Sequence, residues 1–300
     1  MKPDNAHSHS PGGPPVPTGP AKAPPHPLTL DGAALLHQMF RIRWPAWRAL
    51  DAAQKTKIVD EATAVFSEME RHPEGGSALF TQLGHKGDLM IPHFRKNFEG
   101  LNEAELKIAN LALSDYLEPT TSYVSIVELG LYDSTVKLYE ALIAEGLHPQ
   151  SDEWKARVAE RMAEQAEAMA PRLTPSVPPH RYLCFYPMDK KRGEDKNWYM
   201  VPIEKRRDMM REHGMIGRGY AGRVKQIISG SIGFDDWEWG VDLFSDDPLV
   251  FKELIYEMRF DEASAVYALF GPFYIGLRFA ASELGKVLSG EQPTYGPPVE

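Results

Sequence analysis

Hydrophobic residues along the chain recur with two different periods, and stretches of the two periods alternate. Short runs of β-branched and aromatic residues predict strands, whereas apolar residues spaced three and four apart predict amphipathic helices. The first half of the chain reads strand, helix, strand, strand, helix, strand. The expected bounds are 35–43, 51–71, 78–83, 88–94, 102–116 and 121–129.

The second half of the chain repeats this order without repeating the sequence. Its elements are expected at 182–186, 203–213, 224–229, 237–244, 248–258 and 273–279, with Gly214 closing the first helix. Strand, helix, strand, strand, helix, strand is the order of a ferredoxin-like unit. The predicted fold class is therefore α+β, with two ferredoxin-like repeats that form a dimeric α+β barrel within one chain.

Proline and glycine mark the predicted domain boundaries. Residues 1–30 are expected to be a disordered tail rich in Pro, Gly and His, and residues 289–300 a second tail. The N-terminal repeat should span 31–133 and the C-terminal repeat 181–288. A helical connection, 134–180, joins them and ends in a cluster of prolines that begins at Pro171.

Composition narrows the functional classes. The 300 residues are 43% hydrophobic and carry a formal net charge of -9, which argues against a general nucleic-acid binder. Cys184 is the single cysteine, so no internal disulfide and no cysteine-based zinc site can form. We expect a cytoplasmic protein, because the chain has no apolar run of about 18 residues and no secretory signal.

Candidate chemistry concentrates between Arg172 and Ser264, although each residue there has an ordinary interpretation. His213, at the predicted end of a helix, is typical of a capping residue. Tyr186 ends a predicted strand, and Lys190 lies in a basic turn that solvent would cover. GRGYAG, at 217–222, lacks the preceding strand and following helix of a dinucleotide-binding loop.

Longer motifs in this region favour a more specific interpretation. The stretches are CFYPMDKKR, NWYM, REHGMIGRGYAGRVKQIISGSIGFDDWEWGVDLFSDDP and YEMRFDEASAVYALFG. Together they resemble the coproheme decarboxylases of the chlorite dismutase-like superfamily, closely over 170–276 and more loosely back to residue 32. The resemblance implies an α+β barrel with haem in the C-terminal repeat, assembled as a homopentamer.

The resemblance also implies an oxidoreductase of haem biosynthesis. Such an enzyme uses hydrogen peroxide to convert two propionates of iron coproporphyrin III (coproheme) to vinyl groups, and the product is haem b. The porphyrin would be substrate and redox cofactor at once. A coproporphyrin ferrochelatase is the implied transient partner, and neither nucleic acid nor membrane is expected to bind.

The resemblance assigns roles to particular residues. His213 falls on the ligand of the porphyrin iron, and Tyr186 on the catalytic tyrosine that forms a radical. Lys190 falls on a catalytic lysine that pairs with a reacting propionate, while Arg172 and Ser264 fall on propionate contacts. Further pocket positions are Pro187, Met188, Asp189, Gln226, Arg259 and Tyr132.

Two alternative functions are weighed against decarboxylation. A chlorite-splitting enzyme or haem peroxidase is disfavoured by Gln226, because chlorite dismutases have an arginine there and a neutral amide stabilises an oxyanion less well. A non-catalytic haem carrier would need neither Tyr186 nor Lys190.

Overall fold

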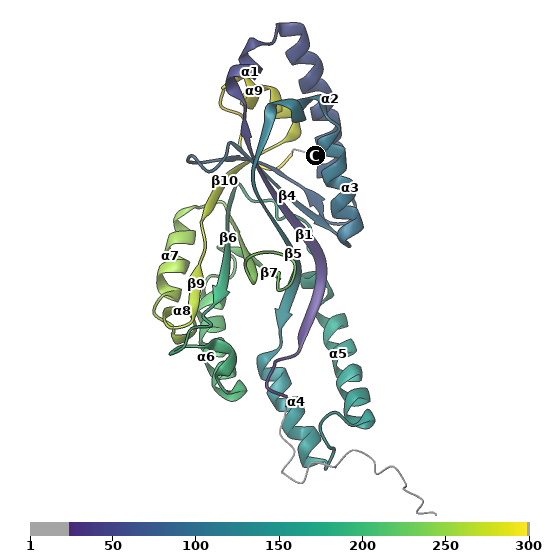
Figure 1. Ribbon diagram of the computed structural model, residues 1–300, viewed down its shortest axis with the longest axis vertical. Coiled ribbons are helices and arrows are strands. Elements are labelled where there is room, and N and C mark those ends of the chain that lie inside the picture. The colour runs from purple at the N-terminus through teal and green to yellow at the C-terminus, as the bar shows by residue number, and fades with distance from the viewer. Residues whose placement is uncertain (1–23, 299–300) are drawn as a thin grey trace, which may run out of the picture.

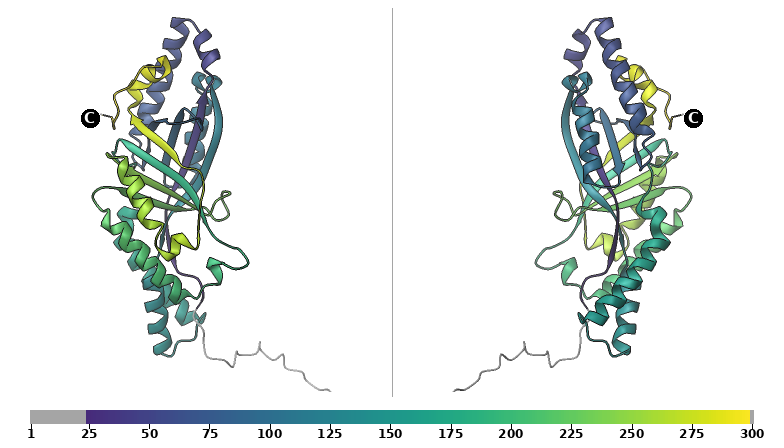
Figure 2. Two further views of the ribbon diagram at one scale, coloured as in Figure 1. Left: turned by 90° about the vertical axis from the view of Figure 1, so that its left-hand side faces the viewer. Right: turned by 90° about the vertical axis from the view of Figure 1, so that its right-hand side faces the viewer.

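The computed structural model describes residues 24–298, and within them the strands form one sheet that closes into a barrel (Figures 1 and 2). The strands are β1 (Thr29–Ile42), β2 (Gly76–Ser77), β3 (Leu79–Gln82), β4 (Leu89–Arg95), β5 (Leu117–Gly130), β6 (Tyr182–Lys190), β7 (Lys225–Gly230), β8 (Trp239–Ser245), β9 (Ala268–Phe270) and β10 (Tyr274–Phe279). The α-helices are α1 (Trp44–Ala49), α2 (Ala52–Glu70), α3 (Phe98–Ala109), α4 (Tyr132–Ala144), α5 (Asp152–Leu173), α6 (Ile203–Gly219), α7 (Leu249–Met258), α8 (Glu262–Ala265) and α9 (Leu284–Ser289).

Each half of the chain contributes one block of antiparallel strands to the barrel. The first block has the order β5-β1-β4-β3 and the second has the order β7-β8-β6-β10. The blocks meet where β5 pairs with β7 and where β10 pairs with β3. Both seams are hydrogen-bonded, so the fold is an α+β barrel in which neither block keeps a free long edge.

Side chains alternate between the two faces of each strand, and this alternation creates separate cores. Leu183 and Phe185 of β6 point into the barrel, where they belong to one core with Leu35 and Phe80 of the first half and Phe244 of the second. Cys184 and Tyr186 of the same strand point outward, into a core that α7 covers. A further core lies at the other end of the molecule, beneath α2, α3 and α9 (Figure 1).

The helices at the lower end of Figure 1 differ in how they meet the barrel. α6, α7 and α8 lie beside the second block of strands, whereas α4 and α5 form a hairpin that extends beyond the sheet. The hairpin has a small core of its own that includes Tyr139, Leu142 and Trp154. α4 also packs against α6, so the hairpin contacts the second half of the chain.

Most predicted strands are confirmed, but β6 continues from Tyr186 to Lys190, so Lys190 is a buried strand residue and not part of a solvated turn. The other corrections concern helices. The helix expected at 102–116 is α3, which ends at Ala109, followed by a 3-10 helix, Ala112–Tyr116. The helical connection is two helices, separated near Gly146, whose φ of 80° suits glycine. Of the predicted tail 1–30, residues 1–23 lie outside the described residues, and β1 already begins at Thr29.

The helix predicted to stop at His213 was the largest error, because α6 continues to Gly219. Gly214 keeps a helical backbone instead of the left-handed one of a C-terminal cap. Ile216 and Tyr220 pack against the outward core of β6 and α7, and this burial favours further helical turns. His213 is therefore an interior residue of α6 and not a capping residue.

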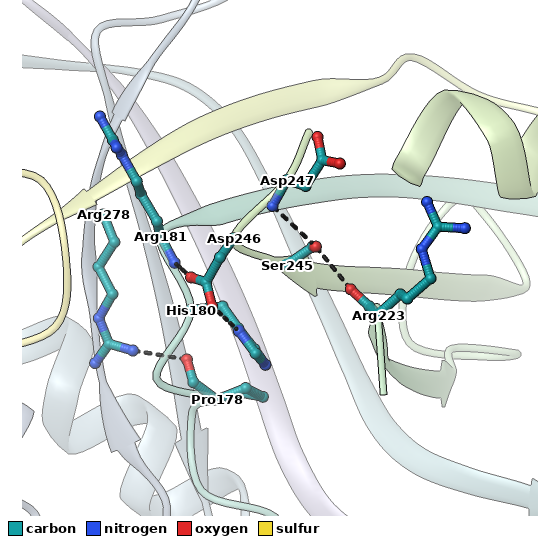
Figure 3. Close-up of polar contacts among 8 residues, drawn as sticks. All are labelled: Pro178, His180, Arg181, Arg223, Ser245, Asp246, Asp247 and Arg278. Carbon is teal, nitrogen blue, oxygen red and sulfur yellow. Dashed lines mark hydrogen bonds and ion pairs between the residues drawn. The ribbon is translucent and has the colours of Figure 1, made fainter. Parts of the chain in front are cut away.

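The proline-rich connection is fastened to the barrel by hydrogen bonds (Figure 3). Arg278 of β10 donates to the carbonyl of Pro178 at 2.7 Å. Asp246, just after β8, accepts from the backbone N–H of Arg181 at 2.9 Å and lies 3.0 Å from Nδ1 of His180. These contacts fix the direction in which β6 enters the sheet.

Candidate functional site

The outward face of β6 carries the candidate reactive residues. Tyr186, Met188 and Lys190 alternate along the strand and so share one face. Gln226 of β7 pairs with Leu243, and Leu243 pairs with Cys184 of β6, which puts Gln226 on that same face. The structure thus brings together, on one surface, residues that are 40 positions apart in the chain.

Tyr186 lies in an aromatic cluster at the middle of this face. Its side chain is 5% exposed, and its ring centroid lies 4.7 Å from that of Phe273 and 5.7 Å from that of Phe270. Burial raises the pKa of the Tyr186 phenol above its ordinary value. The phenol is therefore protonated at neutral pH and shielded from bulk water.

Arg259 borders this aromatic cluster. Its guanidinium carbon lies 4.7 Å from the ring centroid of Phe270. A guanidinium in this position is a donor for carboxylates close to Tyr186.

His213 is held by an acid from the segment between α7 and α8. Its Nδ1 is 2.9 Å from Oδ2 of Asp261 and 3.3 Å from Oγ of Ser264. Asp261 also accepts the backbone N–H of Ser264 at 2.8 Å. Burial by itself would raise the pKa of Asp261, but the hydrogen bonds from His213 and Ser264 lower it overall.

An ionised Asp261 fixes the tautomer of the histidine. The carboxylate can only accept, so Nδ1 of His213 carries the proton and donates it. Nε2 then has a lone pair available for a metal. When a histidine binds a metal through one ring nitrogen, a carboxylate at the other ring nitrogen orients the ring and increases its basicity.

Lys190 is held by the residues that flank this acid. Its Nζ donates to the carbonyl of Ala263 at 2.9 Å and lies 4.5 Å from the ring centroid of Trp198. Burial lowers its pKa from 10.5 to about 8, although Asp261 and Glu238 oppose the shift. One short segment, Asp261 to Ser264, therefore positions both His213 and Lys190.

The remaining pocket positions are distributed around these residues. Met188 pairs with Phe270 of β9, and the carbonyl of Pro187 accepts the N–H of Gly271 at 2.8 Å. Asp189 accepts the backbone N–H of Glu238 at 2.7 Å.

Gln226 of β7 and Tyr132 of α4 lie next to helices or aromatic residues of the site. A Cβ added at Gly217 would lie 3.5 Å from Nε2 of Gln226, so the amide lies against α6, one turn after His213. The ring centroid of Tyr132, at the start of α4, is 6.4 Å from that of Trp198.

Arg172 is the candidate that the structure does not bring to the others. It is exposed on α5, which packs against β1 and β5, and its guanidinium contacts Met169 at 3.9 Å. Among the described residues, none of its polar contacts reaches β6, α6 or α8.

Sequence reasoning missed the residues that support the site. Asp261, Trp198 and Glu238 all lie in the motifs quoted for the resemblance, but no role was assigned to them. Asp261 follows His213 by 48 positions, and no local spacing rule connects them. A buried acid at the N-cap of α8 is visible only after folding.

The chemistry of these donors fits a porphyrin iron better than a bare ion. Within residues 24–298, no three His, Cys, Asp or Glu side chains gather closely enough to hold a metal ion. A porphyrin supplies four nitrogens, so one histidine from the protein suffices.

Among residues 24–298, no helix has the length and apolar character needed to cross a membrane.

Comparison with known proteins agrees with this geometry. The family model described as "Chlorite dismutase" matches residues 55–279. The coproheme decarboxylase of Staphylococcus saprophyticus is 43% identical over 256 residues, which cover 84% of this chain and 94% of that protein. A protein of Natronomonas pharaonis named for heme binding is 41% identical over 271 residues, 89% of this chain, but this chain spans only 42% of its length.

Solved structures show the same fold. A heme-binding protein from Thermus thermophilus has a TM-score of 0.74 and 37% identity, covering 89% of this chain and 100% of that chain. A variant of chlorite dismutase from Candidatus Nitrospira defluvii has a TM-score of 0.65 and 15% identity, covering 86% and 96%. The second likeness concerns the fold alone.

Proposed function

The chain belongs to the chlorite dismutase family, and from this premise we propose that it is a coproheme decarboxylase, an oxidoreductase of haem biosynthesis. It converts two propionates of iron coproporphyrin III to vinyl groups with hydrogen peroxide and yields haem b. The relative with 43% identity over most of both chains is named for this activity. The observation that carries the proposal is the segment Asp261–Ser264, which orients His213 and holds Lys190 beside the face that bears Tyr186.

The reaction balances without a further cofactor. Each propionate loses carbon dioxide, one proton and two electrons to become a vinyl group, and one hydrogen peroxide takes up the two electrons with two protons to give two waters. The substrate porphyrin supplies the oxidising chemistry through its own iron. What remains for the protein is to hold the porphyrin, to place a hydrogen acceptor and to manage protons.

His213 would hold the iron through Nε2, because Asp261 occupies Nδ1. With one protein ligand, the iron would keep a position for peroxide. The neutral amide of Gln226 would offer an oxyanion a weaker contact than an arginine, which favours decarboxylation over the splitting of chlorite.

Tyr186 takes the hydrogen atom from the propionate β-carbon after its own phenol has been oxidised. A phenol can lose an electron and a proton together, and its burial among Phe270 and Phe273 keeps water from the resulting radical. Lys190 pairs with the carboxylate of the reacting propionate. Its flexible ammonium can follow a group that leaves as carbon dioxide.

The finer parts of the proposal rest on the family resemblance. We interpret the two strand blocks as ferredoxin-like repeats. When the four main strands of each half are numbered in chain order, both blocks have the sheet order four-one-three-two, β5-β1-β4-β3 in the first and β10-β6-β8-β7 in the second. A cytoplasmic homopentamer that receives its substrate from a ferrochelatase belongs to the same proposal. The propionate contacts of Ser264 and Arg172 stay predictions. Within the described part of the chain, Arg172 has no polar contact with β6, α6 or α8, so it would have to reach a propionate from outside that group of elements.

The test is a peroxide titration of the protein loaded with iron coproporphyrin III. We expect the porphyrin mass to fall in two steps, and in each step one propionate becomes a vinyl group. The intermediate has three propionates, and the final absorbance is that of haem b. Tyr186→Phe should bind the porphyrin with its affinity nearly unchanged and convert none of it, because the variant keeps the ring and loses the oxidisable O–H.

Three outcomes would contradict the proposal or one of its parts. Full conversion by Tyr186→Phe would remove the radical role of that residue. Sustained oxygen evolution from chlorite, or tight binding of haem b without consumption of coproheme, would favour a chlorite-splitting enzyme or a haem carrier.

A further inference from the structure

A buried carboxylate next to the site has so far no role. Glu238 lies immediately before β8 and is 8% exposed. Its Oε2 accepts the backbone N–H of Lys190 at 3.0 Å and the hydroxyl of Tyr199 at 2.8 Å. Its Oε1 lies 3.4 Å from Nε of Arg192.

These contacts join two ends of the same loop. Residues 191–200 leave β6 after Lys190, turn back at the bridge between Arg192 and Asn197, and end in the 3-10 helix Trp198–Met200. The backbone N–H of Trp198 donates to the carbonyl of Lys191 at 2.9 Å. Glu238 therefore contacts the loop at its start, through Arg192, and at its end, through Tyr199.

The position of this loop decides the surroundings of Lys190. Trp198 is almost fully buried and its ring lies over Nζ of Lys190 at 4.5 Å. Tyr199 is the next residue, so its bond to Glu238 fixes the backbone from which the Trp198 ring extends. Glu238 is itself held on the sheet by the bond from its N–H to Asp189.

We propose that Glu238 is a positioning residue that fastens the loop 191–200 to the sheet and thereby holds Trp198 over Lys190. Its importance for the reaction rests on the proposed function, whereas its effect on the loop does not. The Glu238 carboxylate faces three donors, and hydrogen bonds to a charged acceptor are stronger than hydrogen bonds to a neutral one. Loss of the carboxylate leaves the buried backbone N–H of Lys190 without a partner and releases the more exposed Tyr199 and Arg192.

Glu238 also contributes to the charge balance around the lysine. The acidic groups that face Lys190 are Asp261 and Glu238, and both favour the ammonium form against burial. Arg192 and the protonated Tyr199 approach from the loop and contact Glu238 rather than Lys190. A neutral side chain at position 238 therefore makes the ammonium form of Lys190 less stable than in the native protein.

The first measurement is hydrogen–deuterium exchange of the full-length protein without porphyrin. We expect exchange of the amides in 191–200 to become at least about tenfold faster in Glu238→Ala, as for the loss of a charged hydrogen bond. Glu238→Gln should give a smaller increase. Tyr199→Phe, a mild change at a partly exposed ring, should accelerate mainly the amides of Trp198–Met200.

Glu70→Gln is the matched control. Glu70 is a partly buried carboxylate that holds another 3-10 helix, Ala281–Glu283, through the N–H of Ala281 at 3.1 Å. It should leave exchange of 191–200 unchanged. Native exchange rates in 191–200 for both Glu238→Gln and Tyr199→Phe would overturn the inference, even if Glu238→Ala failed to fold.

The second measurement is the pH profile of coproheme conversion. In Glu238→Gln the loss of activity at alkaline pH should begin at lower pH than in the native protein, and Glu70→Gln should not move it. If Glu238 acted only on the loop, Glu238→Gln would lower the activity without displacing the pH profile. That result would overturn the effect of Glu238 on the protonation of Lys190. If the native protein converts no coproheme, the proposed function fails, but the exchange experiment still decides whether Glu238 fastens the loop.

Discussion

Within residues 24–298, His213 and His180 each have an aspartate at Nδ1, and their different surroundings separate function from anchoring. His213 contacts Asp261 at 2.9 Å beside the candidate iron site. His180 contacts Asp246 at 3.0 Å in the connection that leads to β6 (Figure 3). Asp261 is buried, whereas Asp246 is largely exposed. The same pair of groups should therefore respond differently to the same substitution.

We predict that Asp261→Asn weakens coproheme binding by about 10- to 100-fold, the effect typical of removing a partner behind a metal-binding histidine. The amide no longer enforces the tautomer that leaves Nε2 unprotonated. Titration of the apoprotein, followed by the Soret absorbance, measures the affinity. Asp246→Asn is the control and should bind coproheme like the native protein, and equal losses in both variants would contradict the tautomer argument.

The buried ammonium of Lys190 predicts an alkaline limit for the reaction. Its pKa in the folded protein is lowered to about 8 because burial disfavours the charge. As the pH rises through this value the ammonium loses its proton and cannot pair with a carboxylate. We therefore expect kcat/KM for coproheme to fall above pH about 8, since this parameter reports the free enzyme.

Lys190→Arg provides the comparison, because a guanidinium keeps its proton throughout this range. Steady-state rates on both sides of that pKa are the measurement. The variant should lose the alkaline fall even if its overall rate is lower. An unchanged fall would assign the limit to a group other than Lys190.

At the scale of single elements, α6 shows how tertiary contacts decide where a helix ends. Gly214 is an unfavourable helical residue and was expected to stop the helix, yet α6 runs on to Gly219. Its later turns bring Gly217 against Gln226 and Ile216 into the outward core. His213 thereby gains a rigid helical backbone on both sides.

We predict that Gly214→Ala stabilises the protein by about 0.5–1 kcal/mol, the usual gain for this exchange within a helix. The nearest atom to an added Cβ would be Nη1 of Arg218 at 3.7 Å, an ordinary contact with a flexible side chain. Urea unfolding of the apoprotein measures the change. Destabilisation would show that α6 is strained or frayed at this residue.

At the scale of the whole molecule, a buried polar pair joins the two halves of the barrel. His37 of β1 and Asp242 of β8 are fully buried, with 2.8 Å between Nε2 and Oδ1. His37 also stacks on Phe185, at 4.0 Å between ring centroids, on the strand that carries Tyr186 on its other face. The pair therefore lies directly behind the candidate site.

We predict that Asp242→Ala lowers the free energy of unfolding by about 3–5 kcal/mol, because it leaves His37 buried without a partner. Asp242→Asn should cost less, since the amide can still accept a hydrogen bond. The surface pair gives the control, and Asp246→Ala should cost no more than about 1 kcal/mol. Equal costs for Asp242→Ala and Asp246→Ala in urea unfolding would contradict this account.

The sequence by itself determined the order of strands and helices, and the reason is that alternation and helical spacing are local properties of the chain. It also predicted Tyr186, Lys190 and His213 as site residues, because the resemblance is carried by long continuous motifs that can be read along the chain. The resemblance they carry agrees with the relatives that the comparisons found.

Only the tertiary structure decided which residues meet. Asp261 reaches His213 across 48 positions, Glu238 reaches Lys190 across 48, and His37 reaches Asp242 across 205. It also separated Arg172 from the other candidates and extended α6 beyond Gly214. Such outcomes depend on how strands pair and helices pack, because burial and charge pairing act between surfaces that the chain brings together only when the barrel closes.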